Sequence, residues 1–430
     1  MSEEVPATNL PQAEKQQHAR GVWGWWHGTP LYLRILAGVI LGVIIGVALG
    51  ERAAALAIPA KLVLRLLGAL APPLILLAII QALMRAEIRG KQTLRLFGLL
   101  LVNTLVAIAI GLLVANLVRP GAWAGDTPPP AAIAKMAAAP VDPLSQFLDN
   151  VPKSIAGPFT DDGKVMGVIF LAVALGVAMR RVRYHELRTV DDLVHVGLST
   201  LIVILYWVID VVPFAVFGVV ASIVGVKGFS AFAALGGFVL AVITALLAQT
   251  AYYLLRIRFG SWVRPTVVLN GVRDALVMAF STGSSTATMP LTYACLREKV
   301  GLREQSASLG ALVGSNFNND GTALYEAMSA LFVSQLLGGS LSLDQQFMIV
   351  LTSIAASVGA AGIPEAGLVT MTMVFNAVGL PTDYIAMLLT VDWLLDRCRT
   401  AINVMGDVTV SCLLDGKEPE AGAHEALIVE

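Results

Sequence analysis

The chain has 430 residues, of which 57% are hydrophobic and only 14% are charged, and its formal net charge is −1. This composition is far more apolar than that of a soluble domain, so we expect a polytopic membrane protein. The sequence has no basic block of the kind that binds nucleic acid. Its three cysteines, Cys295, Cys398 and Cys412, lack metal-ligand spacing and indicate neither a zinc site nor a disulfide framework.

Residues 1–30 are polar as far as Gly21 and lack the early apolar core of a cleaved signal peptide, so we expect a cytoplasmic tail there. The tryptophans at its end suit a membrane interface, and a partner-binding patch is the alternative for them. Long apolar stretches follow, each near the roughly 20 residues that cross a bilayer. They cover residues 31–50, 61–84, 95–118, 164–179, 192–224 and 229–255.

Basic residues between the apolar stretches indicate which connections face the cytoplasm. Clusters follow the second, fourth and sixth stretches, and a further cluster, Arg297, Lys299 and Arg303, comes only one apolar segment later. Residues 265–296 are therefore expected to enter the membrane and return to the same side. Their centre, residues 280–290, is small and hydroxylated and ends in a proline, which is poor material for a continuous helix. It is typical of a re-entrant hairpin tip, and a pair of amphipathic cytoplasmic helices is the alternative.

This pattern of a hairpin followed by a polar helix occurs twice. An apolar helix after the first hairpin is interrupted at residues 314–321, and residues 345–380 contain a second tip, rich in glycine and closed by a proline, at 357–364. Paired interruptions of this kind indicate an inverted-repeat transporter with its binding site near the middle of the membrane. Close helix packing would explain the glycines, but not the asparagines and the aspartate beside them.

One apolar helix near the C-terminus carries polar side chains along a single face. They are Asp392, Asp396, Arg399, Asn403 and Asp407. At about 100° per residue they fall within a sector of roughly 80°, and Arg397 points elsewhere. Each ionised group at the centre of a bilayer costs at least about 2.5–3.5 kcal/mol. This polar stripe is therefore expected to face a cavity lined by protein or water, which is the first candidate for a working site.

At these residues the sequence closely resembles the dicarboxylate/amino acid:cation symporter family, which includes excitatory amino acid transporters and archaeal aspartate transporters. The resemblance rests on DGTALYE at 320–326, GAAGIPEAGLVTM at 359–371 and VDWLLDRCRTAINVMGD at 391–407. It implies an all-α integral membrane protein of the elevator type, with eight transmembrane helices, two re-entrant helical hairpins and inverted repeats. It also implies a homotrimer in the plasma (inner) membrane with both termini in the cytoplasm.

The resemblance divides the membrane domain, residues 31–415, into a fixed and a moving part. Residues 31–75 and 180–224 would form the scaffold, residues 76–118 and 263–415 would form the transport core, and residues 416–430 would form a cytoplasmic tail. The second hairpin would be the extracellular gate. Substrate and cations would stabilise its closed form, and their different affinities for the two facing states would drive alternating access.

By resemblance, Arg399 clamps the side-chain carboxylate of the substrate, a task suited to a planar fork of donors. Asp396 would accept the α-ammonium group. The remaining substrate groups would be Asn403, Thr322, Ser284, Ser285 and Gly362. Keeping both Arg399 and Asp396 favours L-glutamate and L-aspartate, because each charge would otherwise be buried without its partner.

Alternatives to acidic amino acid symport stay open at this point. A C4-dicarboxylate or a neutral amino acid symporter would be a member of the same family, and a substrate-gated anion channel would be a different class of protein. A membrane enzyme is disfavoured, because the sequence shows no Ser/His/Asp, Cys/His or His-metal constellation. An internal Arg–Asp pair without any ligand is the structural alternative for Arg399 and Asp396.

The resemblance also implies sites for co-transported Na⁺, a hard cation that favours oxygen ligands. One site uses Asp407 with carbonyl groups of Gly314, Asn318 and Asn403. A second uses Asp320 with the Asn318 side chain and two residues of the third stretch, Asn103 and Thr104. A third uses carbonyl groups of the second hairpin, at Ser357, Val358 and Ala360. No cofactor is implied, and H⁺ and K⁺ are the further ions that the family transports.

The chain departs from the family pattern mainly around the cation sites. Asn319 replaces a methionine, Asn316 replaces a threonine, and Leu100, Asn103 and Thr104 align with a tyrosine, a threonine and a serine or threonine. One predicted ligand is therefore missing and another is replaced by an amide. Uptake that followed pH and ignored the sodium gradient would overturn the expected use of sodium.

Three further residues receive roles by resemblance or by register. Glu326 occupies a position at which proton-coupled members carry glutamate, and burial would let its carboxyl group bind a proton near neutral pH. A neutral structural glutamate is the alternative. Arg397 supports the site from the other face of its helix, from which it could reach Asp396 or Glu326, and Asp392 is assigned to orienting its neighbours. Glu365, beside the second tip, either tunes gating or faces water.

Overall fold

The structure is a computed structural model that describes residues 29–59, 90–124, 188–227, 230–359 and 366–418, with single positions between 63 and 80 and between 168 and 173. All regular structure in these residues is helical, which agrees with the expected all-α chain. Its N-terminal half contains α3 (Leu31–Leu49), η2 (Gly50–Ala57), α5 (Gly90–Val118), η3 (Pro120–Ala124), α10 (Arg188–Lys227) and α11 (Ser230–Gly260). The tail, 1–28, and most of the second and fourth apolar stretches lie outside the described residues.

Three helices in the described part are long and apolar enough to cross a membrane: Leu33–Leu56, Leu94–Trp123 and Ala233–Gly260. They coincide with the first, third and sixth predicted stretches. The fifth stretch is a single helix, α10, which is 40 residues long and contains Pro213. An apolar part of α10, Ile209–Ser222, is shorter than these spans. The described helices therefore account for only some of the eight expected spans.

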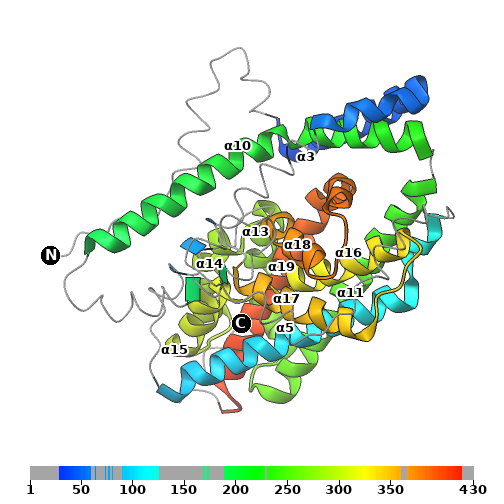
Figure 1. The fold of residues 1–430 in the computed structure, drawn as a ribbon. Coiled ribbons are helices and arrows are strands. Elements are labelled where there is room, and N and C mark those ends of the chain that lie inside the picture. Colours follow the sequence, from blue (N-terminus) through cyan, green and yellow to red (C-terminus); the bar gives the residue numbers. More distant parts are fainter. Residues whose placement is uncertain are drawn as a thin grey trace.

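Helices α3 and α10 pack closely along a row of glycines (Figure 1). A β-carbon at Gly38, Gly42 or Gly46 would lie 2.7, 2.8 or 2.6 Å from a backbone carbonyl oxygen of α10. Small residues at every fourth position let two helix backbones approach in this way. Arg34 also pairs with Asp210, with a distance of 2.9 Å from Nη1 to Oδ1. The two helices thus form one close-packed unit.

The first predicted hairpin is a helix–turn–helix. After α12 (Pro265–Gly271), α13 (Arg273–Thr282) ends at Gly283, whose φ of 65° is left-handed, and α14 (Ser285–Ala294) packs against it. The Ser284 hydroxyl caps α14 by accepting a hydrogen bond from the Ala287 N–H at 3.1 Å. The turn falls within the predicted tip. Pro290, however, lies inside α14, which continues to Ala294, so it does not close the tip.

The first hairpin is followed by η4 (Cys295–Lys299), α15 (Glu304–Ala307), η5 (Ser308–Val313) and η6 (Gly314–Asn316). The helix then breaks at residues 317–319 and resumes as α16 (Asp320–Leu336), as predicted. Helices α17 (Leu343–Gly359) and α18 (Ala366–Ala377) pack together as the arms of the second hairpin. Residues 360–365, with Ala360, Gly362 and Glu365, lie outside the described residues.

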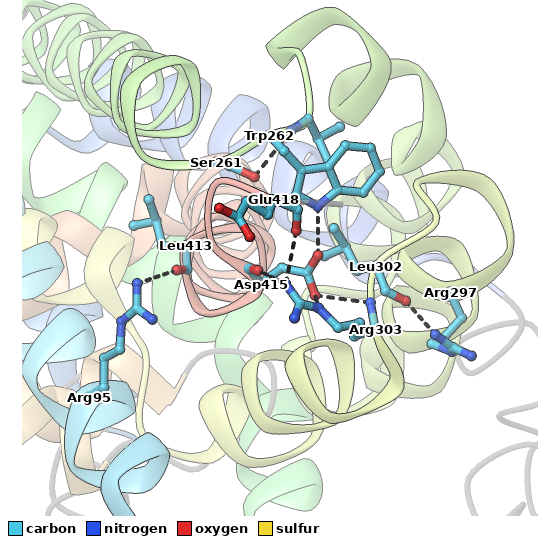
Figure 2. A network of polar contacts seen from close by, with 10 residues as sticks. Arg95, Ser261, Trp262, Arg297, Leu302, Arg303, Leu413, Asp415 and Glu418 are labelled. Atoms are coloured by element: carbon cyan, nitrogen blue, oxygen red, sulfur yellow. Dashed lines mark hydrogen bonds and ion pairs between the residues drawn. The ribbon is translucent and has the colours of Figure 1, made fainter. Parts of the chain in front are cut away.

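The chain ends with η7 (Thr382–Tyr384) and the 31-residue helix α19 (Ile385–Asp415), which packs against α11, α13 and α16. A polar network holds its last turn (Figure 2). Asp415 accepts hydrogen bonds from the Arg303 backbone at 3.0 Å and from Trp262 Nε1 at 2.7 Å. Arg95 of α5 donates to the Leu413 carbonyl at 2.8 Å. Arginines at a helix C-terminus satisfy its free carbonyl groups and favour its dipole.

This network also bears on the path of the chain. Trp262 precedes the first hairpin and Arg303 follows it, and both bind the same carboxylate, Asp415. The segment between them therefore leaves and returns to one end of α19, and its entry into the membrane stays a prediction. Arg95 belongs to the basic cluster after the second apolar stretch and reaches the same helix end. The two clusters thus meet on one side of the molecule.

Candidate functional site

The polar stripe of α19 is buried along its whole length. Asp392, Asp396, Arg399, Asn403 and Asp407 are each at most 8% exposed, and Arg399 is fully buried. Arg397, which the helical register places elsewhere, is only partly buried. A buried row of charges inside an apolar protein needs compensating partners, because an isolated buried charge is strongly unfavourable.

The Arg399 guanidinium lies where α16, α18 and α19 meet. Its Nη2 is 2.7 Å from Asp396 Oδ1 and 3.1 Å from Asp392 Oδ1, and its Cζ is 4.0 Å from the ring centroid of Tyr325. A β-carbon at Gly367 of α18 would be 3.3 Å from Nη1. Within the described part of the chain, Nε and Nη1 have no hydrogen-bond partner although they are buried. The guanidinium therefore keeps donors that suit the carboxylate of a ligand.

Asn403 fastens the start of α16 to α19. Its Oδ1 accepts from the Gly321 N–H at 2.8 Å, and its Nδ2 donates to Asn319 Oδ1 at 3.2 Å and to Thr322 Oγ1 at 3.4 Å. A β-carbon at Gly321 would lie 2.6 Å from the Arg399 carbonyl oxygen, so this position requires glycine. Thr322 and Asn403 thus lie together beside Arg399, and their role as substrate groups stays a prediction.

The first hairpin tip also reaches α19. Ser284 and Ser285 at the tip are buried, and Ser285 Oγ has no partner among the described residues. Arg397 Nη1 donates to the carbonyl oxygens of Phe280, at 3.1 Å, and Ser281. The idea that Arg397 reaches Asp396 or Glu326 is therefore not what the structure shows. Arg397 lies two residues before Arg399 in the helix. Its side chain is therefore rotated about 200° around the helix axis from that of Arg399 and faces α13.

The residues of the first predicted cation site lie near one another, and their binding of a cation stays a prediction. Asn318 Nδ2 donates to Asp407 Oδ1 at 2.9 Å and to the Asn403 carbonyl at 3.1 Å. A β-carbon at Gly314 would lie 3.2 Å from Asp407 Oδ1. Asn318 Oδ1 is buried and has no partner in the described ranges. The Asp407 carboxylate and backbone carbonyl groups are oxygen donors of the kind that a hard cation prefers, and the free Asn318 Oδ1 belongs to the second predicted site.

The second predicted cation site assembles only in part. Asp320 Oδ1 accepts from Thr104 Oγ1 at 2.6 Å, and its Oδ2 accepts from the Tyr253 hydroxyl of α11. Asn103 Oδ1, the atom predicted to bind the cation, accepts a hydrogen bond from Arg256 Nη1. Leu100 packs in an apolar cluster with Phe317 and Val410. Tyr253 and Arg256 were not predicted as residues of this site. They lie three positions apart in an apolar helix, which is a sequence signal for a polar helix face.

The two predicted cation sites flank Gly406. A β-carbon there would lie 2.4 Å from Asn318 Nδ2 and 3.1 Å from Asp320 Oδ2. The absence of a side chain at this position therefore allows both groups to approach α19.

The third predicted cation site is altered by Asn319. The Asn319 N–H donates to Ser357 Oγ at 3.1 Å, and its Nδ2 donates to the Ser357 carbonyl at 2.9 Å. This carbonyl is one that the resemblance assigns to a cation, and here it accepts an amide hydrogen. Val358 is partly buried beside an apolar cluster, and Ala360 lies outside the described residues. Asn319 instead ties the broken helix to α17.

Glu326 is fully buried on α16. Its Oε1 accepts a hydrogen bond from the Thr370 hydroxyl of α18, while Oε2 has no partner in the described segments. Glu326 therefore links the broken helix to the second arm of the hairpin through one hydroxyl, with no salt bridge among the described residues.

Apolar helices of membrane-spanning length around a buried charged stripe define an integral membrane protein of the helical class with a polar internal site. A model of the sodium:dicarboxylate symporter family matches residues 31–417. The chain belongs to this family, whose members are transporters, and the resemblance inferred from its motifs is confirmed.

Excitatory amino acid transporters are among the relatives of the chain. Transporter 1 of Ambystoma tigrinum is 29% identical over 409 residues, which cover 81% of this chain and 75% of that protein. Transporter 2 of Homo sapiens is 35% identical over 294 residues, 65% of this chain and 50% of that protein. Transporter 4 of Rattus norvegicus is 38% identical over 250 residues, 56% of this chain and 44% of that protein. The chain thus spans about half the length of most of these relatives.

Proposed function

We propose that the chain is a secondary active symporter of L-glutamate and L-aspartate, driven by Na⁺ and coupled to H⁺. The observation that carries this proposal is the pairing of Arg399 with Asp396 at 2.7 Å in a fully buried position that retains unused guanidinium donors. An acidic amino acid would bring a carboxylate to Arg399 and an ammonium group to Asp396. Each buried charge would then keep an opposite partner, which a neutral amino acid or a dicarboxylate could not supply to both.

The proposed architecture is that of an elevator with eight spans and two re-entrant hairpins. Residues 31–75 and 180–224 form its scaffold, and the glycine contact between α3 and α10 supports treating them as one unit. Residues 76–118 and 263–415 form its transport core, in which Arg303 donates a hydrogen bond to Asp415. The proposal includes a homotrimer in the plasma membrane, cytoplasmic termini, and the second hairpin as the gate.

The function is tested by reconstituting the full chain in liposomes and measuring uptake of radiolabelled L-aspartate and L-glutamate. Gradients of Na⁺, H⁺ and K⁺ are imposed separately, each with the membrane potential clamped. We expect concentrative uptake with an inward Na⁺ gradient. Equilibration without concentration would indicate a channel, preference for succinate would indicate a dicarboxylate carrier, and preference for a neutral amino acid would indicate the third alternative. Each of these results would contradict the proposal.

Replacing Glu326 by glutamine is expected to make uptake independent of pH. Glutamine keeps the size of the side chain and can still accept the Thr370 hydrogen bond, but it has no proton to gain or lose. Uptake by the wild type should fall as pH rises, by up to about tenfold per pH unit once a single carboxyl group loses its proton. The measurement is the initial rate of aspartate uptake between pH 5.5 and 8.5.

The matched control for this change is Glu298→Gln, because Glu298 is exposed. This control should keep the pH profile of the wild type. If Glu326→Gln kept that profile as well, Glu326 would be a neutral structural residue and the proton would be carried elsewhere.

A further inference from the structure

The two clusters around Asp407 and Asp320 differ in what their oxygen atoms bind. At Asp407, the carboxylate Oδ1 accepts a hydrogen bond from Asn318 Nδ2, while Asn318 Oδ1, which the resemblance assigns to the Asp320 site, has no partner in the described part of the chain. At Asp320, both carboxylate oxygens accept hydroxyl hydrogens, from Thr104 and Tyr253. The Asn103 carbonyl oxygen accepts from the Arg256 guanidinium. The two Asp320 oxygens each keep a lone pair beyond these hydrogen bonds, whereas the Asn103 oxygen is bound by a positively charged side chain.

Arg256 brings a permanent positive charge to this cluster. It lies on α11, three residues after Tyr253, so both side chains extend from the same face of the helix. The ring of Tyr252 lies 5.6 Å from the Arg256 Cζ and helps to hold the guanidinium in place. A guanidinium cannot lose its proton in a protein. A sodium ion on the same amide oxygen would face a like charge within a few ångströms, and the two would repel strongly in this partly buried place.

We propose that Arg256 takes the place of a co-transported sodium ion in the Asp320 cluster. The guanidinium supplies, as part of the protein, the positive charge that the ion would bring. Tyr253, on the same face of α11, donates a hydrogen bond to Asp320 Oδ2 and joins this helix to the cluster. The transport cycle would then carry one sodium ion fewer than the family pattern implies. The number of sodium ions carried per cycle rests on the proposed function, whereas the number of sodium ions that the purified protein binds does not.

The direct test measures binding of ²²Na⁺ to the purified full chain, without substrate, and counts equivalents per chain. Arg256→Met keeps an unbranched side chain but removes the charge and the donors to Asn103. We expect this variant to bind one equivalent more than the wild type. The matched control is Arg258→Met, because Arg258 is exposed on the same helix, and it should bind as the wild type does. Equal binding by Arg256→Met and the wild type would overturn the proposal.

A second measurement needs no variant. In proteoliposomes, the ratio of ²²Na⁺ to L-aspartate taken up by the wild type should be two at most, one below the three sites that the resemblance implies. A ratio of three would overturn the proposal even if Arg256→Met failed to fold. If no aspartate were taken up, the proposed function would fail, and the ²²Na⁺ comparison would still decide whether Arg256 excludes an ion.

Discussion

Arg399→Cys is expected to lower L-aspartate uptake by about 100-fold or more. Truncating one member of a buried, hydrogen-bonded charge pair costs about 2–5 kcal/mol, and about 3 kcal/mol corresponds to about 100-fold. Arg399 is fully buried and is the group that would meet the side-chain carboxylate of the substrate. The measurement is the initial rate of radiolabelled aspartate uptake in proteoliposomes, at equal protein content.

Loss of Arg399 also leaves Asp392 and Asp396 without their common partner, so folding must be separated from function. Binding of L-serine serves this purpose, because Asp396 can still accept the ammonium group of a neutral amino acid. A folded Arg399→Cys protein should therefore bind serine while it loses aspartate. Arg258→Cys, on the exposed side of α11, is the control and should transport as the wild type does. Unchanged aspartate uptake by Arg399→Cys would refute the assignment of Arg399.

Asp407→Asn is expected to raise the sodium concentration needed for half-maximal uptake by about tenfold or more, equivalent to about 1.4 kcal/mol. Asp407 supplies the carboxylate of its cluster, and affinity for a hard cation depends on the charge of its ligands. Asparagine has nearly the same shape, and its oxygen can still accept the hydrogen bond from Asn318. The effect should therefore appear in sodium dependence, with the fold retained.

Sodium titration of aspartate uptake measures this change directly. Asp383→Asn, at an exposed position before α19, is the matched control and should leave the titration curve in place. A curve for Asp407→Asn that coincided with that of the wild type would mean that sodium does not bind at this cluster. Loss of the protein from the detergent-soluble, monodisperse fraction would instead reveal a structural role, which size-exclusion chromatography detects.

Much of the site could be predicted because local rules apply to it. The α19 stripe follows from helical periodicity and from the cost of charges in an apolar segment, and its members are buried as expected. The breaks at Gly283 and at residues 317–319 coincide with residues that disfavour helix. Pro290 shows the limit of such a rule, because its helix continues through it.

Contacts between distant helix faces could not be predicted in this way. Arg256 and Asn103 are 153 positions apart, and neither the apolar pattern of α5 nor that of α11 records which face of one meets the other. Tyr253 reaches Asp320 for the same reason. The glycines of α3 were also missed, because their close contact depends on α10 lying beside them. Arg397 could be placed on its own helix, but its partner on α13 could not be inferred.

The break before α16 makes three successive residues into a junction between four helices. Asn318 bonds Asp407 of α19, Asn319 bonds Ser357 of α17, and Asp320 accepts hydrogen bonds from Thr104 of α5 and Tyr253 of α11. A rotation of this short segment toward one of these helices would strain its hydrogen bonds to the others. Asn318, which bonds Asp407, and Asn319, which bonds Ser357, are consecutive residues. A shift of Asp407 would therefore be passed on to α17, so this segment couples the predicted cation site to an arm of the second hairpin.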